Sequence, residues 1–184
     1  MAHPRLLDVD RSALMVIDIQ EAFRSVIPDF PLLASRASTA VRGFQLMDRP
    51  IVITEQYPKG LGHTAEEIRL ALSDDFEFVE KSEFSGCLGG IVDDFRSRGV
   101  SHVAVCGIES HICVNQTVHG LLDQGFDVHI LADAVASRTD ENRAIALAKM
   151  SSSGAVLSSV EMALFELLRD SKHEKFKEMQ SLIK

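Results

Sequence analysis

The sequence predicts a doubly wound α/β fold, with a six-stranded, mostly parallel sheet that is flanked by helices on both faces. Two observations predict it. Apolar runs of strand length alternate with segments of helical periodicity along the chain. The runs are continuous rather than alternating, which is typical of parallel strands buried on both faces. We expect a single domain over residues 1–184, because this length suffices for one large core and no linker or repeat interrupts the pattern.

Six apolar runs are the expected strands. They lie at residues 13–17, 50–53, 76–79, 102–106, 126–131 and 154–157. The second run leads into residues 57–62 (YPKGLG), the one extended loop of turn residues. Ligands bind at the carboxyl ends of the strands in such sheets, so this loop is a candidate pocket wall.

Helical patterns fill the intervals between the runs. They cover residues 32–47, 88–98, 113–124, 139–150, 159–168 and 176–183. The fourth helix begins at Thr139 and has two acids in its first turn, where they suit the helix dipole. The last helix carries an apolar stripe, which either docks on the core of its own chain or serves self-association. The stripe consists of Phe176, Met179, Leu182 and Ile183.

The composition restricts the classes of partner. The net charge is −8 without a cluster of Lys or Arg, which argues against nucleic acid or an anionic membrane. No apolar run approaches the ~18 residues of a membrane span, and residues 1–10 lack the apolar core of a signal peptide. The 3 cysteines are widely spaced, which indicates reduced thiols. We therefore expect a soluble, cytoplasmic protein that binds a small molecule.

Three residues with catalytic potential stand at or just beyond the ends of predicted strands: Asp18, Lys81 and Cys113. Cys113 falls in the first turn of a predicted helix, where free N–H groups and the helix dipole favour a thiolate and can stabilise an oxyanion. A nearby carboxylate could take the thiol proton, and an ammonium group could support the developing negative charge. The combination indicates a hydrolase with a cysteine nucleophile.

Each of these residues also has a plainer interpretation. An aspartate at the end of a strand is often a helix cap, and Lys81 between Glu80 and Glu83 is typical of a surface ion pair. Cys87 also opens a predicted helix and is the rival nucleophile. Cys106 lies within an apolar strand, so we expect a buried small hydrophobe.

Metal and nucleotide cofactors are not indicated. The 7 histidines show none of the spacings typical of metal sites, and the chain has neither a GxGxxG motif nor a P-loop. We therefore expect a site without a metal ion or other cofactor.

Three segments resemble motifs of the isochorismatase-like cysteine hydrolases, a superfamily that includes the nicotinamidases. Residues 16–23 (VIDIQEAF) resemble the D-x-Q-x-x-F block of the catalytic base, and residues 80–85 (EKSEFS) resemble the segment of the catalytic lysine. Residues 107–117 (GIESHICVNQT) resemble the nucleophile block. Residues 54–62 are most similar to the isochorismatase domain-containing subgroup, and they lack the metal-binding Asp-x-His of nicotinamidases.

The resemblance implies catalytic roles for Asp18, Lys81 and Cys113 and a sheet in the order 3-2-1-4-5-6. In that order the strand of Lys81 lies two positions from that of Asp18, so the lysine must reach across on its long side chain. It also implies a cis peptide between Ile108 and Glu109, and an oxyanion hole made by the backbone N–H groups of Glu109 and Cys113. Residues near these blocks are expected to line the pocket: Gln20, Phe23, Gln56, Tyr57 and His111.

The expected activity is hydrolysis of a small molecule with an amide, carbamoyl or related acyl carbon, acting on C–N bonds through a thioester intermediate. The alternative is a non-catalytic binding or assembly protein that retains the fold. The resemblance further implies a homo-oligomer, either a dimer or a multiple of one.

Overall fold

The computed structural model describes residue 3 and residues 5–184, and its centre is a six-stranded sheet in the order β3-β2-β1-β4-β5-β6. Every strand pairing in this sheet is parallel. The predicted α/β fold is therefore confirmed, as is the sheet order that the resemblance implies. The strands are β1 (Ser12–Ile17), β2 (Ile51–Gln56), β3 (Val79–Lys81), β4 (His102–Ile108), β5 (Asp127–Ala136) and β6 (Val156–Ser158).

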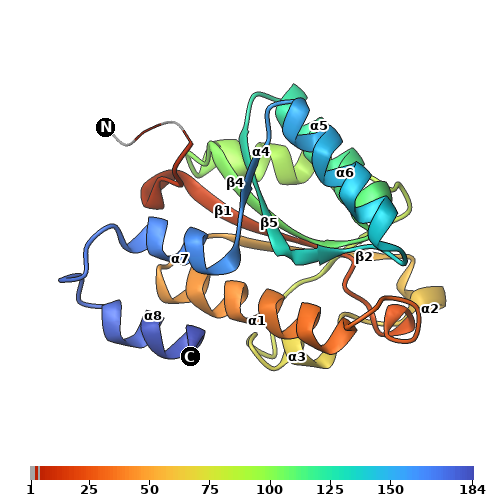
Figure 1. Ribbon diagram of the computed structural model, residues 1–184, viewed down its shortest axis with the longest axis horizontal. Helices are drawn as coiled ribbons and strands as arrows, with labels where there is room; N and C mark the ends of the chain where they lie inside the picture. Colours follow the sequence, from red (N-terminus) through yellow and green to blue (C-terminus); the bar gives the residue numbers. More distant parts are fainter. Residues whose placement is uncertain (1–2, 4) are drawn as a thin grey trace.

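Helices form a layer on each face of the sheet (Figure 1). One layer holds α1 (Phe30–Leu46), α3 (Glu66–Arg69), α7 (Val160–Leu168) and α8 (Phe176–Ile183). The other holds α4 (Gly89–Ser97), α5 (Asn115–Asp123) and α6 (Asp140–Ser152). Shorter helical turns complete the chain: η1 (Val9–Arg11), η2 (Glu21–Phe23), α2 (Pro58–Leu61) and the π-helical turn η3 (Ser110–Val114). No helix of the described residues is long and apolar enough to cross a membrane.

Local sequence signals account for several helix starts. The Thr139 side chain accepts a hydrogen bond from the Asn142 N–H at the start of α6. Ser159 caps α7 in the same way through the Met162 N–H. The first N–H groups of a helix have no acceptor within the helix, and a Ser or Thr side chain can supply one. The position of such a residue in the sequence therefore indicates where these two helices begin.

Strand β5 is longer than the apolar run predicted, since it continues past Asp133 to Ala136. A carboxylate is tolerated within this strand because the Val160 N–H donates to Asp133 Oδ1 at 2.9 Å. The Arg143 side chain also donates to the carbonyl oxygen of Val135 at 2.9 Å. The residues that follow β5 therefore lie further along the sheet than the sequence pattern indicates.

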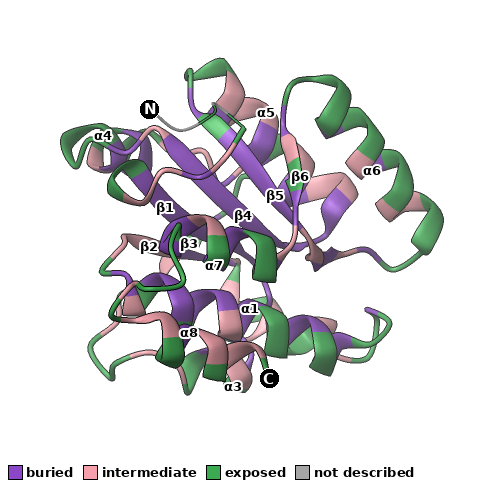
Figure 2. Ribbon diagram, turned by 60° about the vertical axis from the view of Figure 1, so that its left-hand side comes forward, coloured by how far each residue is buried: buried purple, intermediate pink, exposed green. Residues whose placement is uncertain are grey.

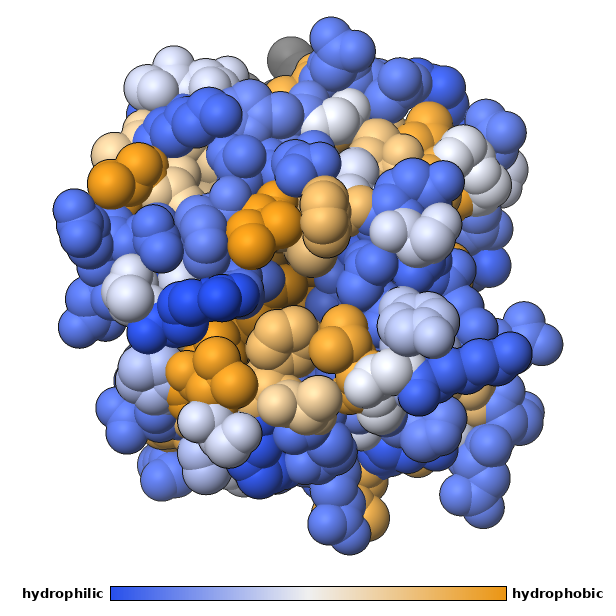
Figure 3. All heavy atoms as spheres, turned by 90° about the vertical axis from the view of Figure 1, so that its right-hand side faces the viewer, coloured by the Kyte–Doolittle hydropathy of each residue, from blue (hydrophilic) through white to orange (hydrophobic). Residues whose placement is uncertain are grey.

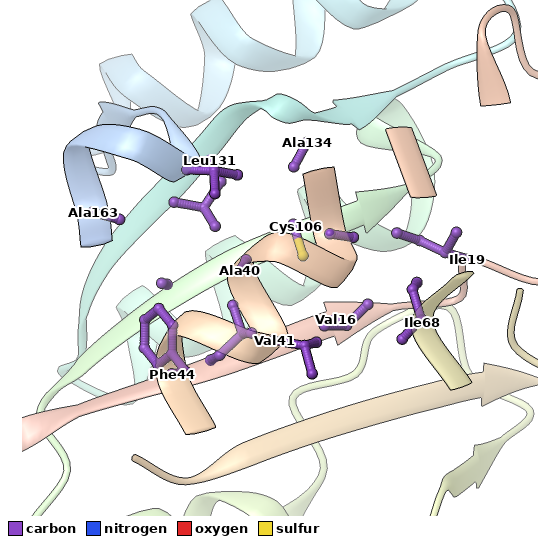
Figure 4. Packing of buried hydrophobic residues seen from close by; sticks show 14 of the residues in the cluster. Val16, Ile19, Ala40, Val41, Phe44, Ile68, Cys106, Leu131, Ala134 and Ala163 are labelled. Atoms are coloured by element: carbon purple, nitrogen blue, oxygen red, sulfur yellow. The ribbon is translucent and has the colours of Figure 1, made fainter. Parts of the chain in front are cut away.

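The core has two parts, one on each face of the sheet, because successive strand residues point to opposite sides. The central strands are buried along their length (Figure 2). Cys106 of β4 points toward α1 among apolar side chains (Figure 4), which confirms its expected place in the core. The apolar stripe of α8 packs on the same core, with Met179 fully buried, so this helix docks on its own chain.

Candidate active site

Asp18 follows directly after β1 and has a left-handed backbone with a φ of 52°. Aspartate is one of the residues that adopt this conformation with little strain. The carboxylate is buried and held at both oxygens. The Thr54 hydroxyl donates to Oδ1 at 2.7 Å, and Lys81 Nζ donates to Oδ2 at 2.7 Å. Asp18 is therefore a fixed charge of the site and not a helix cap.

Lys81 is the last residue of β3, and its side chain crosses beyond β2 to reach Asp18. Its Nζ also donates to Gln56 Oε1 at 2.7 Å, and the carbonyl oxygens of Glu83 and Phe84 lie 3.1 Å away. The side chain is 0% exposed, so the surface ion pair that its neighbours suggested does not form. A buried ammonium group is tolerated here because each N–H finds an acceptor.

Cys113 lies in the turn η3, between β4 and α5. Burial and the nearby Asp18 carboxylate raise the pKa of its thiol to about 12, and these effects outweigh the opposing effect of Lys81. The resting site therefore holds a neutral thiol. The shift runs opposite to the expectation that the helix start would favour a thiolate, because burial and the adjacent Asp18 carboxylate both disfavour the charged form of the thiol.

The other two cysteines lie outside this site. Cys87 packs against Gly120 of α5, and burial raises the pKa of its thiol. Burial also raises the pKa of Cys106 well above its usual range. Neither thiol lines the cavity that contains Asp18, so Cys113 is the cysteine that the fold brings to the acid.

A cavity of about 170 Å³ opens beside Asp18 and Cys113. It lies at the carboxyl ends of the strands, on a face where apolar side chains surround a hollow (Figure 3). Two of the expected pocket residues, Phe23 and Gln56, belong to its wall. The full lining is Asp18, Phe23, Gln56, Leu61, Phe84, Ile108, Glu109, Ile112, Cys113 and Arg138.

The three other expected pocket residues lie outside this lining. Gln20 clamps the loop after β2, since its Nε2 donates to the carbonyl oxygens of Gln56 and Gly62 at 3.0 and 2.7 Å. Tyr57 is 62% exposed, so its ring lies at the molecular surface. His111 has its Nδ1 3.0 Å from the Ser137 hydroxyl.

Glu109 and Arg138 form an ion pair at the cavity wall. The Glu109 carboxylate is buried, and it accepts from the backbone N–H, Nε and an Nη of Arg138 at 3.1, 3.0 and 2.7 Å. This arginine holds the pKa of Glu109 below its ordinary value. The peptide between Ile108 and Glu109 is cis, as the resemblance implies. Arg138 is not among the residues that the sequence singles out, because the apolar run that predicts β5 ends at residue 131 while the strand continues to Ala136.

The donor set around β2 does not fit a metal ion. Glu55 Oε1 accepts from both the N–H and the hydroxyl of Thr64, at 2.7 and 2.8 Å. His63 Nδ1 lies 3.5 Å from Glu55 Oε2, and its side chain is 74% exposed. Across the described residues, no group of three or more His, Cys, Asp or Glu side chains is arranged to hold a metal ion. Glu55 holds the loop that carries the cavity residue Leu61.

A six-stranded parallel sheet in the order β3-β2-β1-β4-β5-β6, with helices on both faces, is the architecture of the isochorismatase-like α/β proteins. The isochorismatase domain model matches residues 12–162. The chain therefore belongs to the isochorismatase family.

Relatives match nearly the whole chain. It is 40% identical over 173 residues to isochorismatase domain-containing protein 2 of Xenopus laevis, covering 94% of this chain and 83% of the relative. It is 39% identical to the secreted isochorismatase effector Isc1 of Phytophthora sojae, and the match covers 94% of this chain and 84% of the relative. Among solved structures, one described as MAR1 ribonuclease from Caenorhabditis elegans is 38% identical with a TM-score of 0.92, covering 97% and 92%.

Proposed function

We propose that this protein is a cysteine-nucleophile hydrolase that cleaves C–N bonds of small molecules with an amide, carbamoyl or related acyl carbon. The observation that carries the proposal is the buried Asp18 carboxylate, which Lys81 and Thr54 hold beside the thiol of Cys113. A base, a positive charge and a nucleophile are the groups that an acyl transfer through a thioester requires.

The first step is attack on the substrate. Because the resting thiol is neutral, its proton passes to Asp18 as the sulfur bonds to the carbonyl carbon. The carbonyl oxygen becomes an oxyanion, which the backbone N–H groups of Glu109 and Cys113 stabilise. The Lys81 ammonium group compensates the negative charge of the site, which lies on the Asp18 carboxylate before the proton transfer and on the oxyanion after it.

The second step releases the products. Asp18 gives its proton to the leaving nitrogen as the C–N bond breaks, which frees an amine or ammonia and leaves an acyl thioester on Cys113. Asp18 then takes a proton from a water molecule that attacks the thioester. The acid product leaves, and the proton returns to the sulfur. The donors of this chain complete the cycle without a metal ion or other cofactor.

Ribonuclease activity is a second candidate, because the C. elegans relative is described as a ribonuclease. Two features of this chain favour a small, non-nucleic-acid substrate instead. The net charge is −8, which repels a polyanion, and the cavity is small and lined mainly by apolar side chains. Incubation with single-stranded and double-stranded RNA tests this alternative, with Cys113→Ala as the control.

Self-association and cytoplasmic location remain predictions. Since the apolar stripe of α8 packs on the core of its own chain, the stripe by itself gives no argument for a homo-oligomer. Light scattering at micromolar concentration is expected to give a dimer or a multiple of it, and a stable monomer contradicts this. One relative is named as a secreted effector, so cell fractionation is the appropriate test of location.

The test of the proposed activity is a screen of amides, carbamates and ureas that measures amine or ammonia release. At least one class is expected to be hydrolysed, and rapid acid quenching is expected to trap a mass increase on the peptide that contains Cys113. Hydrolysis that persists in Cys113→Ala contradicts the mechanism. Binding of these compounds without turnover favours a non-catalytic binding protein.

A further inference from the structure

Two ion pairs flank the nucleophile. Lys81 Nζ lies 2.7 Å from Asp18 Oδ2, and an Arg138 Nη lies 2.7 Å from Glu109 Oε2. Asp18, Glu109 and Arg138 line the cavity, and Lys81 is paired with one of these lining residues. Both carboxylates are buried. The formal charges of these four groups cancel, so the wall of the cavity has no net charge.

The rest of the wall is apolar or uncharged. Apart from the two ion pairs, no charged side chain is found among the described residues that line the cavity. Five apolar side chains make up most of the surface: Phe23, Leu61, Phe84, Ile108 and Ile112. A carboxylate or ammonium group that entered this space would lose its hydration without gaining a free counter-charge, which is costly in a site of low polarity.

We propose that the Glu109–Arg138 ion pair determines specificity by neutralising the cavity wall, so that the site accepts uncharged carbonyl compounds with a small apolar substituent. The pair excludes compounds that carry a carboxylate or an ammonium group. This inference rests on the proposed function, because it concerns the substrate of the same site. It assigns Arg138 a role in substrate selection rather than in the bond-breaking steps.

The arrangement of the pair makes the role testable. Glu109 is buried, whereas the Arg138 side chain is 54% exposed and reaches the carboxylate from the segment after β5. Removing the guanidinium leaves a buried negative charge, and removing the carboxylate leaves a positive charge at the wall. The two variants therefore shift the preference of the site for charged compounds in opposite directions.

The first experiment uses two alkylating reagents of nearly equal size, neutral iodoacetamide and anionic iodoacetate. In both reactions a C–S bond forms, a C–I bond breaks, iodide leaves, and the thiol proton passes to Asp18 or to solvent. Both reagents react with the same thiolate, so the ratio of the two rates at Cys113 does not depend on the fraction of Cys113 that is ionised. It is measured at pH 8 by mass spectrometry that resolves the three cysteines, and it is divided by the same ratio for N-acetylcysteine amide.

The wild-type protein is expected to favour iodoacetamide by about tenfold or more over the reference thiol. Arg138→Gln is expected to raise this preference further, and Glu109→Gln to lower it toward or below the reference. The double variant Glu109→Gln/Arg138→Gln restores a neutral wall, so it is expected to return to the wild-type preference. Arg138→Lys keeps the charge and serves as the conservative control. Circular dichroism checks that each variant is folded.

The second experiment compares hydrolysis of matched amides. Propionamide is paired with glycinamide, which replaces a methyl group by an ammonium group, and isovaleramide is paired with malonamate, which replaces an isopropyl group by a carboxylate. The neutral member of each pair is expected to have the higher kcat/KM, and Glu109→Gln is expected to narrow the gap for malonamate.

The outcomes separate this inference from the proposed function. If the wild-type alkylation ratio equals that of the reference thiol, or if the single variants leave it unchanged, the role of the ion pair is wrong even when amides are hydrolysed. If the ratio shifts as expected while no amide is hydrolysed, the cavity selects neutral compounds and the proposed amide hydrolysis fails.

Discussion

Three catalytic candidates are buried at the carboxyl ends of the strands, where they have hydrogen-bond and ion-pair partners. Two histidines are buried toward the opposite end of the same sheet, and they have almost no hydrogen-bond partners. The triad cluster is Asp18, Lys81 and Cys113, and both carboxylate oxygens of its acid accept hydrogen bonds. The histidine pair is His102 of β4 and His129 of β5, whose ring centroids lie 5.8 Å apart. Both ring nitrogens of His129 lack a hydrogen-bond partner among the described residues.

The difference reflects the charge state of each group. Full charges are retained inside a protein only with partners, so Lys81 and Asp18 depend on one another. Imidazole can remain neutral when it is buried, and it then packs much as an aromatic ring does. Burial disfavours the protonated, charged form of each ring. It lowers the pKa of His129 to about 4, and it also lowers the pKa of His102.

Removing the nucleophile gives the largest expected effect on the triad cluster. Cys113→Ala is expected to lower the rate of hydrolysis at least about ten-thousand-fold, because the covalent route is lost. Thermal unfolding should change little, since the side chain lies at a cavity. Cys87→Ala is the matched control and is expected to keep its activity. Loss of activity in Cys87→Ala together with retention in Cys113→Ala reverses the assignment of the nucleophile.

Breaking the buried ion pair tests whether the triad cluster depends on its partners. Lys81→Met leaves the Asp18 carboxylate buried without its ammonium partner, so the free energy of unfolding is expected to fall by about 3–5 kcal/mol. The double variant Asp18→Asn/Lys81→Met removes both charges and should recover most of that loss while remaining inactive. Urea denaturation measures the cycle. Additive losses in the double variant contradict a coupled pair.

Acidification tests the histidine pair. The pKa of His129 is about 4 in the folded protein and about 6.5 when the chain is unfolded, so the folded state binds fewer protons. Its contribution to stability is complete above pH 6.5 and declines as the pH falls to about 4, by about 3 kcal/mol. The groups that affect its titration are His102 and Asp127.

His129→Leu is the matched variant for this prediction, because it keeps an apolar volume without a titrating group. The difference in unfolding free energy between wild type and variant is followed by denaturation at pH 8 and at pH 5. The variant is expected to be less sensitive to pH across this interval. Equal sensitivity of both proteins means that the acid response arises from other groups.

The smallest effect concerns a hydrogen bond that supports the triad cluster. The Thr117 hydroxyl donates to the carbonyl oxygen of Cys113 at 2.7 Å and accepts from the Gly86 N–H at 2.7 Å, so it ties the nucleophile turn to the loop after Lys81. Thr117→Val keeps the shape but leaves the N–H unpaired, and we expect a loss of about 1–2 kcal/mol in unfolding free energy. Thr117→Ser should lose less. Equal losses in both variants point to packing rather than to the hydrogen bond.

The sequence by itself determined the fold class and, through the three segments that resemble the isochorismatase-like hydrolases, the sheet order and the catalytic candidates. Continuous apolar runs mark strands buried on both faces, and their carboxyl ends share one edge, so residues at those ends come together. This reasoning singled out Asp18, Lys81 and Cys113, and the fold places the first two in direct contact. In a parallel sheet the carboxyl ends of all strands lie at the same edge, so a residue at the end of its strand is brought to that edge.

Only the tertiary structure decided the state and surroundings of these groups. The Cys113 thiol is neutral because of burial and of Asp18, which is distant in the chain, so its local position at a helix start misleads. Arg138 reaches Glu109 because β5 runs past Asp133, where a contact with the start of α7 satisfies the carboxylate. Desolvation and long-range hydrogen bonds set both outcomes, and neither quantity exists until the chain has folded.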